Sequence, residues 1–223
     1  MNKEQAWSYS SLGAFETCPW RWYLTKISKE IVEPQTDATL WGNRVHKAFE
    51  HRISNGTPFT PELAHYEPVA QTILTRAKGK TVATEQKIAI NNRYREVKYF
   101  AKDVWLRVVL DLSIERGTKA VLLDYKTGKK VHDTQQLRLS AATYFATHPW
   151  IDEITNVFIW LKTGESSKEV FGKDDAPAIW NDFIPRVNRL NEAVNLNKFP
   201  KRPSGLCKNY CPVGKRLCEH CGV

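Results

Sequence analysis

The sequence predicts an α/β fold in which a mixed central β-sheet is flanked by helices. The order of patterns supports this prediction: helical segments open the chain, a series of alternating strands follows, and a helix–strand–helix unit comes next. Of the 223 residues, 42% are hydrophobic, which is enough to bury a sizeable core. The length favours one large domain with a small appendage.

Three helices are predicted before the first strand. An apolar stripe predicts the first over 10–26, capped by a serine and broken at Cys18-Pro19, because proline disrupts a helix interior. The second covers 39–54, and the third lies near 68–76.

The remaining elements follow from alternation and helical periodicity. They are strands over 84–90, 93–100, 104–115 and 120–126, a helix over 134–147, a strand over 156–161 and a helix over 178–197. The tail from residue 200 is rich in Pro, Gly, Lys and Cys. We therefore assign 1–199 to the main domain with its N-terminal helical segment, and 200–223 to a metal-binding tail packed back on the N-terminus.

Composition excludes several classes of protein. No apolar run approaches the roughly 18 residues of a membrane span. The N-terminal segment lacks the apolar core of a secretory signal, so we expect a cytoplasmic protein without a membrane partner. The net charge of +9 is compatible with an anionic partner such as nucleic acid.

A hairpin around Gly117-Thr118 carries a candidate metal site. Two turn residues with glycine first are typical of a type II′ hairpin. In that register Asp111 lies directly opposite Asp124, with Cβ atoms about 4.5–5.5 Å apart. Lys126 points to the same face as Asp124, because strand side chains alternate.

Two carboxylates this close repel each other, and a divalent cation relieves the repulsion. Mg²⁺ or Mn²⁺ binds one or two carboxylates together with water and substrate phosphate. A lysine beside the ion orients or deprotonates an attacking water, or stabilises charge on a phosphate. The alternative is a solvated polar face. The apolar neighbours of both aspartates favour the metal site.

These residues resemble a known catalytic signature. Asp111 with Asp124-Tyr125-Lys126 resembles that of the PD-(D/E)XK nuclease superfamily, which implies a restriction-endonuclease-like core. Four more segments resemble its RecB-like exonuclease branch: Gly42 through His46 to Glu50, Thr84-Glu85, Gln136-Leu137, and Ser10 to Leu24 with Cys18-Pro19. Together the five motifs span nearly the whole chain.

The resemblance implies metal-dependent hydrolysis of DNA phosphodiester bonds. The residues it implies are the metal ligands His46, Asp111 and Asp124, the catalytic residues Asp111, Asp124, Lys126 and Gln136, and Glu85 behind the ligands. Two positions depart from the family pattern. Val108 stands where glycine is frequent, and Ser140 where tyrosine is common, with Tyr144 one turn further.

Four of the five cysteines lie in the C-terminal tail, which in a cytoplasmic chain indicates metal ligation before disulfides. In one assignment Cys18, Cys207, Cys211 and Cys218 hold a [4Fe–4S] cluster. This resembles AddB-type nuclease subunits and the CRISPR adaptation nucleases, and the position of Cys18 favours it. In the other, Cys207, Cys211, Cys218 and Cys221 bind zinc. Free or partly paired thiols are the third possibility.

The combined prediction is a DNA exonuclease that uses Mg²⁺ or Mn²⁺ and carries a structural iron–sulfur cluster. It implies a role in recombination or repair in a bacterial or phage-infected cell. One alternative is a structure-specific or restriction-type endonuclease. The other, of a different class, is a catalytically quiet nucleic-acid-binding module, against which the intact Asp111, Asp124 and Lys126 set argues. No protein partner is identified from the sequence.

Overall fold

The structure is a computed structural model that describes residues 4–130 and 133–222. It divides into two compact units. Thr36–Asn181 form the sheet unit, and Met1–Gln35 with Asp182–Val223 form the unit of the chain ends. Within the described residues, none of the helices combines the length and hydropathy that a membrane span requires.

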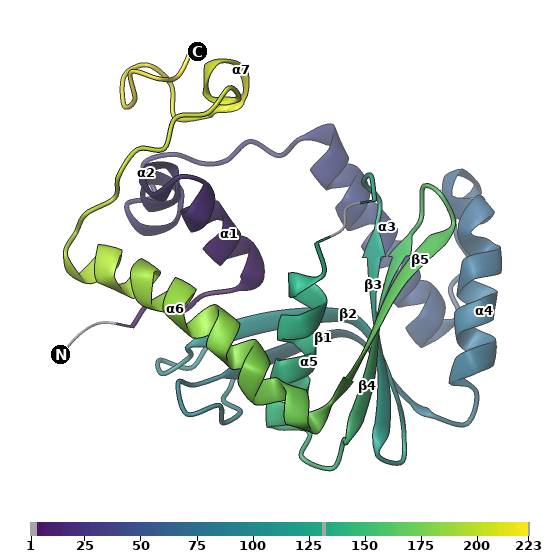
Figure 1. Cartoon of the computed structure of the whole chain (residues 1–223). Coiled ribbons are helices and arrows are strands. Elements are labelled where there is room, and N and C mark those ends of the chain that lie inside the picture. Colours follow the sequence, from purple (N-terminus) through teal and green to yellow (C-terminus); the bar gives the residue numbers. More distant parts are fainter. Residues whose placement is uncertain (1–3, 131–132, 223) are drawn as a thin grey trace. The chain divides into compact units, whose positions relative to one another are not determined.

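The predicted α/β class is confirmed by a five-stranded mixed sheet in the order β1-β2-β3-β4-β5 (Figure 1). Its strands are β1 (Thr81–Ile90), β2 (Leu106–Arg116), β3 (Lys119–Lys126), β4 (Glu153–Trp160) and β5 (Glu165–Gly172). Among the strands of the described residues, only β3 and β4 pair in parallel. They are joined through helix α5 (Gln135–Thr147), since parallel neighbours need a crossover connection.

The predicted hairpin register is confirmed where β2 and β3 pair. Arg116 lies opposite Lys119 around Gly117, whose φ of 60° suits the first position of a type II′ turn. Further along the ladder, Leu112 lies opposite Leu123. The hairpin therefore has the two-residue loop that the sequence predicts.

The prediction of a strand over 93–100 is wrong, because this segment is a loop. The side-chain oxygen of Asn91 accepts hydrogen bonds from the backbone N–H groups of Arg93 and Arg95, at 3.0 and 3.1 Å. This local capping occupies donors that a strand ladder would use. Conversely, β5 is not predicted from the sequence, because it is largely polar and exposed and lacks an apolar alternation.

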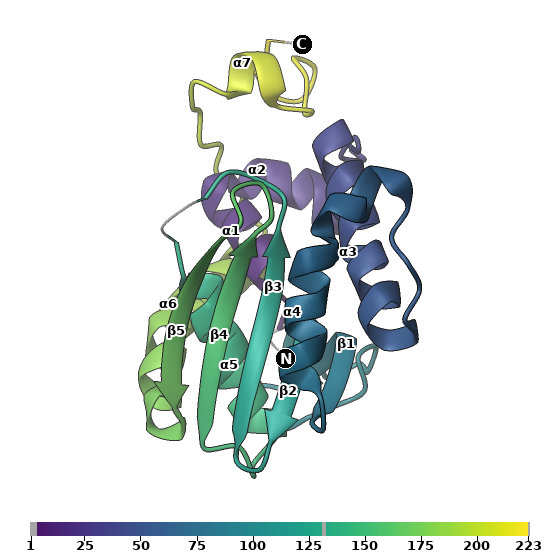
Figure 2. The ribbon, with the colours of Figure 1, turned by 90° about the vertical axis from the view of Figure 1, so that its right-hand side faces the viewer.

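Helices cover both faces of the sheet (Figure 2). Helices α3 (Asp37–Asn55) and α4 (Glu67–Ala77), with a 3₁₀ helix over Pro61–Tyr66 between them, pack on one face. The buried residues of this core are Val45, Phe49, Leu63, Tyr66, Ala70, Ile73, Ala77, Leu112, Ile114, Leu123, Tyr125 and Leu161. On the other face Leu137 of α5 packs against Phe158 and Trp160 of β4.

The helices at the two chain ends complete the secondary structure. They are α1 (Tyr9–Thr17), α2 (Pro19–Trp22), a π-helical turn (Tyr23–Ile27), a 3₁₀ turn (Lys173–Asp175), α6 (Ala176–Asn195) and α7 (Cys207–Tyr210). The predicted break at Cys18-Pro19 is confirmed, because Cys18 is extended with φ −157°.

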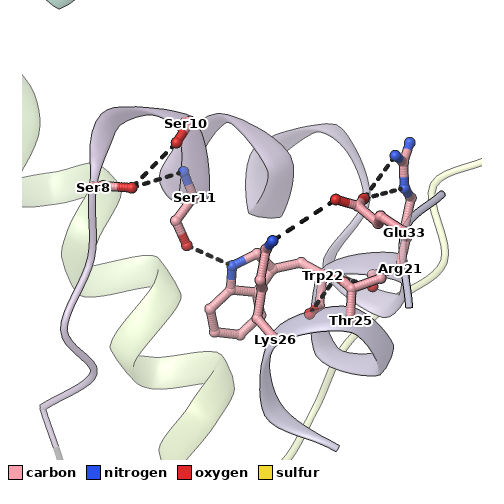
Figure 3. Close-up of polar contacts among 8 residues, drawn as sticks. All are labelled: Ser8, Ser10, Ser11, Arg21, Trp22, Thr25, Lys26 and Glu33. Atoms are coloured by element: carbon pink, nitrogen blue, oxygen red, sulfur yellow. Dashed lines mark hydrogen bonds and ion pairs between the residues drawn. The ribbon is translucent and has the colours of Figure 1, made fainter. Parts of the chain in front are cut away.

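Side-chain contacts fix the N-terminal helical segment (Figure 3). Ser8 caps α1 by accepting from the backbone N–H of Ser11, and the indole N–H of Trp22 donates to the Ser11 hydroxyl at 3.0 Å. Downstream, the carboxylate of Glu33 pairs with Arg21 at 2.8 Å. These contacts hold the broken helix in one arrangement around Cys18.

Replacing Phe49 with alanine should destabilise the sheet unit by about 3–5 kcal/mol, because it empties a large core position. Phe49 is fully buried, and its ring centre lies 4.3 Å from that of Tyr125 on β3. Urea unfolding followed by tryptophan fluorescence measures the change. Val170→Ala is the control, since Val170 is 53% exposed on β5 and should change stability by less than about 0.5 kcal/mol. Equal unfolding midpoints for the two variants would contradict this core.

Candidate active site

His46 lies on α3, one helical turn before the buried Phe49, so the core anchors the helix face that carries it. Its Nδ1 lies 3.1 Å from Oδ1 of Asp111 on β2. Burial lowers the pKa of His46, but the hydrogen bond to Asp111 and the charges of Asp111, Asp124 and Glu85 raise it above its ordinary value overall. The imidazole therefore lies in a strongly negative environment.

The buried carboxylate of Asp111 joins two strands and a helix. Its Oδ1 contacts His46, and its Oδ2 accepts a hydrogen bond of 2.7 Å from the backbone N–H of Tyr125 on β3. The backbone pairing between β2 and β3, which are both described in full, ends one pair before Asp111 and Asp124. The direct backbone pairing expected for these two residues is therefore not formed, because the Asp111 side chain binds the β3 backbone instead.

Glu85 lies on β1 beside this contact. The β1–β2 ladder runs through both of its neighbours but skips Glu85 itself, whose φ is 47°. A side-chain-bearing residue in this left-handed region is strained, and such strain concentrates at functional sites. Burial and the charge of Asp111 raise the pKa of Glu85.

One ligand atom from each of His46, Glu85 and Asp111 lies within 4.8 Å of the others. We call these three residues the carboxylate cluster. An imidazole nitrogen and two carboxylate oxygens are donors that Mg²⁺ or Mn²⁺ accepts. Glu85, expected behind the metal ligands, thus lies in this group with His46 and Asp111. Asp124, the third residue expected to bind the ion, is not part of the group.

Asp124, Lys126 and Gln136 make a closed set of contacts, which we call the lysine cluster. The ammonium of Lys126 lies 2.8 Å from Oδ2 of Asp124 and donates to Oε1 of Gln136 at 2.9 Å. The Gln136 amide nitrogen donates in turn to Oδ1 of Asp124 at 2.6 Å. Each member therefore orients the other two.

The position of Gln136 depends on how α5 is held against the sheet. The fully buried Asn156 of β4 donates through its side-chain nitrogen to the carbonyl of Leu137. Near the other end of α5, the hydroxyl of Tyr144 donates to Glu115 of β2. Tyr144 therefore anchors α5 to β2.

Asp124 is the most perturbed carboxyl group of the site. Burial and the negative charge of Asp111 raise its pKa to about 6, although Lys126 acts in the opposite direction. Its Oδ2 is buried and accepts no hydrogen bond of good geometry. The polar group closest to this oxygen is the ammonium of Lys126, which forms an ion pair with it. An under-satisfied buried carboxylate is costly, and a bound cation would relieve that cost.

An open cavity of about 790 Å³ lies at the carboxylate cluster. Lys47 of α3 and Lys87 of β1 line it together with the cluster. The cavity thus combines donors for a cation with ammonium groups suited to phosphate. Lys87 is not among the residues predicted from the sequence. Its spacing of two residues from Glu85 on a strand is the signal that indicates it.

The unit of the chain ends contains a second candidate site. All five cysteines are free thiols and line one cavity of about 110 Å³. Burial and hydrogen bonding with Cys211 and Cys218 raise the pKa of the Cys221 thiol to about 12. Cys207, by contrast, accepts a hydrogen bond from the backbone N–H of Ser204 at 3.3 Å. No three sulfur atoms of these described cysteines lie mutually within 4.8 Å.

The tail of this unit packs on the N-terminal helical segment. Leu24 shares a buried apolar cluster with Val213, Cys218 and Cys221. The indole N–H of Trp20 also donates to the carbonyl of Leu217 at 2.9 Å. The cavity is thus walled by segments from both ends of the chain.

Comparison with known proteins identifies the family. A search of curated proteins gave no match. Among solved structures, one titled "Crystal structure of SSO0001" is 14% identical, with a TM-score of 0.47, over 98% of this chain and 88% of that chain. The family model described as "PD-(D/E)XK nuclease superfamily" matches residues 6–219. Because that match covers nearly the whole sequence, the chain belongs to the PD-(D/E)XK nuclease superfamily.

Proposed function

We propose that this chain is a metal-dependent DNA exonuclease of the RecB-like branch, acting in phage or bacterial recombination or repair. Its superfamily indicates a nuclease that hydrolyses phosphodiester bonds with a divalent metal. The observation that carries the proposal is that Asp111 connects the two clusters. Its Oδ1 contacts His46, and its Oδ2 accepts a hydrogen bond from the backbone N–H of Tyr125, the residue between Asp124 and Lys126. The five motifs in order support the RecB-like assignment.

In this proposal Mg²⁺ or Mn²⁺ is held by His46, Asp111 and Asp124, with Glu85 as a further ligand. The fit rests on the donor atoms of His46, Glu85 and Asp111, which lie within 4.8 Å of one another, and on the buried Oδ2 of Asp124, which accepts no hydrogen bond of good geometry. When bound, the ion lowers the pKa of a coordinated water and stabilises charge on the scissile phosphate. Its positive charge also offsets the mutual repulsion of the carboxylates.

The protein's own residues act around that ion. Lys126, oriented by Asp124 and Gln136, donates to a phosphate oxygen and stabilises the negative charge that develops there. Gln136 keeps Lys126 and Asp124 at a fixed separation through its two contacts. His46 holds Asp111 from the helix side, while Tyr125 holds it from the strand side.

We further propose that the cysteine cavity holds a structural [4Fe–4S] cluster. Four thiolates bound to one zinc ion lie about 2.3 Å from the ion and therefore about 3.8 Å from one another. No three of the described cysteine sulfurs lie that close to one another, which favours the larger cluster. The proposed ligands are Cys18, Cys207, Cys211 and Cys218. The contacts of Cys221 with Cys211 and Cys218 support a second set in which Cys221 replaces Cys207.

The exonuclease proposal is tested with end-labelled linear DNA and closed circular DNA in Mg²⁺ and in Mn²⁺. An exonuclease should degrade the linear DNA and leave the circle intact, because it needs a free end. Cleavage of the circle would instead indicate an endonuclease. Binding of both forms without cleavage would indicate a nucleic-acid-binding module.

Lys126→Ala and Asp124→Asn should each lower the DNA cleavage rate by about 100-fold or more, because each removes transition-state stabilisation. Asp124→Asn keeps the side-chain shape and removes a buried charge. Its melting temperature in EDTA should therefore not fall, whereas the rise in melting temperature on adding Mg²⁺ should be reduced. Lys168→Ala, on the exposed edge strand β5, is the control and should cleave at the unaltered rate. Wild-type cleavage by both site variants would contradict the assignment.

Protein purified without oxygen should be brown and absorb broadly in the visible range, as thiolate-bound iron–sulfur clusters do. Cys18→Ser should remove the colour and lower the melting temperature. Comparing Cys207→Ser with Cys221→Ser identifies the fourth ligand, because only loss of a ligand bleaches the protein. A colourless protein with stoichiometric zinc that tolerates Cys18→Ser would establish the zinc alternative. A metal-free protein of full stability would contradict both.

A further inference from the structure

A strip of basic and aromatic side chains continues from the carboxylate cluster along β1 and β2. Lys87 lies two residues beyond Glu85 on β1, and Val109 pairs with it across the ladder. Arg107 lies four residues before Asp111 on β2. Because strand side chains alternate, all of these share the face of the sheet that carries the cluster.

The far end of the strip is formed by the loop between β1 and β2. The Tyr99 ring lies beside both cations, with Lys87 5.9 Å and Arg107 5.7 Å from its centre. The guanidinium Nε of Arg107 also donates to the Tyr99 carbonyl at 2.8 Å. Phe100 follows, and its ring centre lies 5.1 Å from that of Tyr99. We call Lys87, Tyr99, Phe100, Arg107 and Val109 the basic strip.

The loop is held in place although its tip is exposed. Val97 donates from its backbone N–H to the carbonyl of Ala89 on β1 at 2.9 Å, in addition to the Arg107 contact. Phe100 nevertheless remains 83% exposed. An anchored loop thus presents a large aromatic ring to solvent at the end of a row of cations.

The charge and the length of the basic strip indicate which ligand it fits. Residues 87–107 contain six Lys and Arg against two Asp and Glu. Four residues of strand from Asp111 to Arg107 span about 13 Å, roughly the length of four stacked nucleotides at 3.4 Å each. An exposed aromatic ring next to cations is how proteins hold unpaired bases and their phosphates.

We propose that the basic strip binds a single DNA strand and leads it to the carboxylate cluster. Lys87 and Arg107 contact backbone phosphates, and an unpaired base stacks on Phe100. A base inside a duplex offers no free face to this ring, so the strip selects single-stranded over double-stranded DNA. This inference rests on the proposed function, since it names the substrate form taken by that site.

The test measures binding separately from cleavage. Fluorescence anisotropy records the affinity of labelled single-stranded DNA and of labelled blunt-ended duplex DNA for the Asp124→Asn protein in Mg²⁺. Adding Phe100→Ala should weaken single-strand binding by about 5- to 100-fold and leave duplex binding within about twofold, because base stacking is lost. Adding Lys87→Ala should weaken binding and reduce the salt slope by about one, because one phosphate contact is lost. Lys168→Ala in the same background is the charge-matched control and should change neither affinity.

Unchanged single-strand affinity in Phe100→Ala and Lys87→Ala overturns the basic strip, even if the wild-type protein cleaves DNA. An equal loss of duplex and single-strand binding in Phe100→Ala overturns the single-strand assignment. The expected binding losses in a chain whose wild-type form cleaves no DNA would support the strip and refute the proposed exonuclease. The outcomes that refute the basic strip therefore differ from the outcome that refutes the exonuclease proposal.

Discussion

The buried carboxylate of Asp111 is the contact on which the candidate site depends. One of its oxygens holds the β3 backbone at Tyr125 and the other holds His46 of α3. Its negative charge also perturbs Glu85 and Asp124 on the two neighbouring strands. A single group thus ties β2 to β3 and to α3, and it concentrates negative charge near Glu85 and Asp124.

The two clusters around Asp111 present different chemical groups. The carboxylate cluster faces an open cavity and concentrates donors for a cation. The lysine cluster is held together by the mutual contacts of its three members, although Oδ2 of Asp124 accepts no hydrogen bond of good geometry. An ammonium group suited to phosphate and carboxylates suited to a cation therefore lie in neighbouring clusters of one candidate site, connected through Asp111.

The structural features that depend on short-range sequence patterns could be predicted from the sequence. The two-residue turn at Gly117, the helix that carries His46 and the break at Cys18 all follow from local rules about turns, periodicity and proline. The D-x-K spacing also brings Lys126 to the side of Asp124, because strand side chains alternate.

Other features could not be predicted because they depend on contacts between distant segments. The separation of β2 from β3 at Asp111 results from a side chain that replaces a ladder bond. The left-handed backbone of Glu85 opposes its local preference and is imposed by the surrounding sheet. Likewise, alternation alone predicts a strand after Asn91, whereas capping by that side chain produces a loop.

The two units differ in when they can form during synthesis. Thr36–Asn181 is one continuous stretch, so its sheet can assemble before the residues that follow Asn181 are translated. The cysteine cavity needs Cys18, which is synthesised early, and four cysteines that are synthesised only after the whole sheet unit. The walls of this cavity can therefore come together only after the sheet unit has been translated. A chain that stops before Cys207 would retain the sheet unit and would lack four of the five thiols of the cavity.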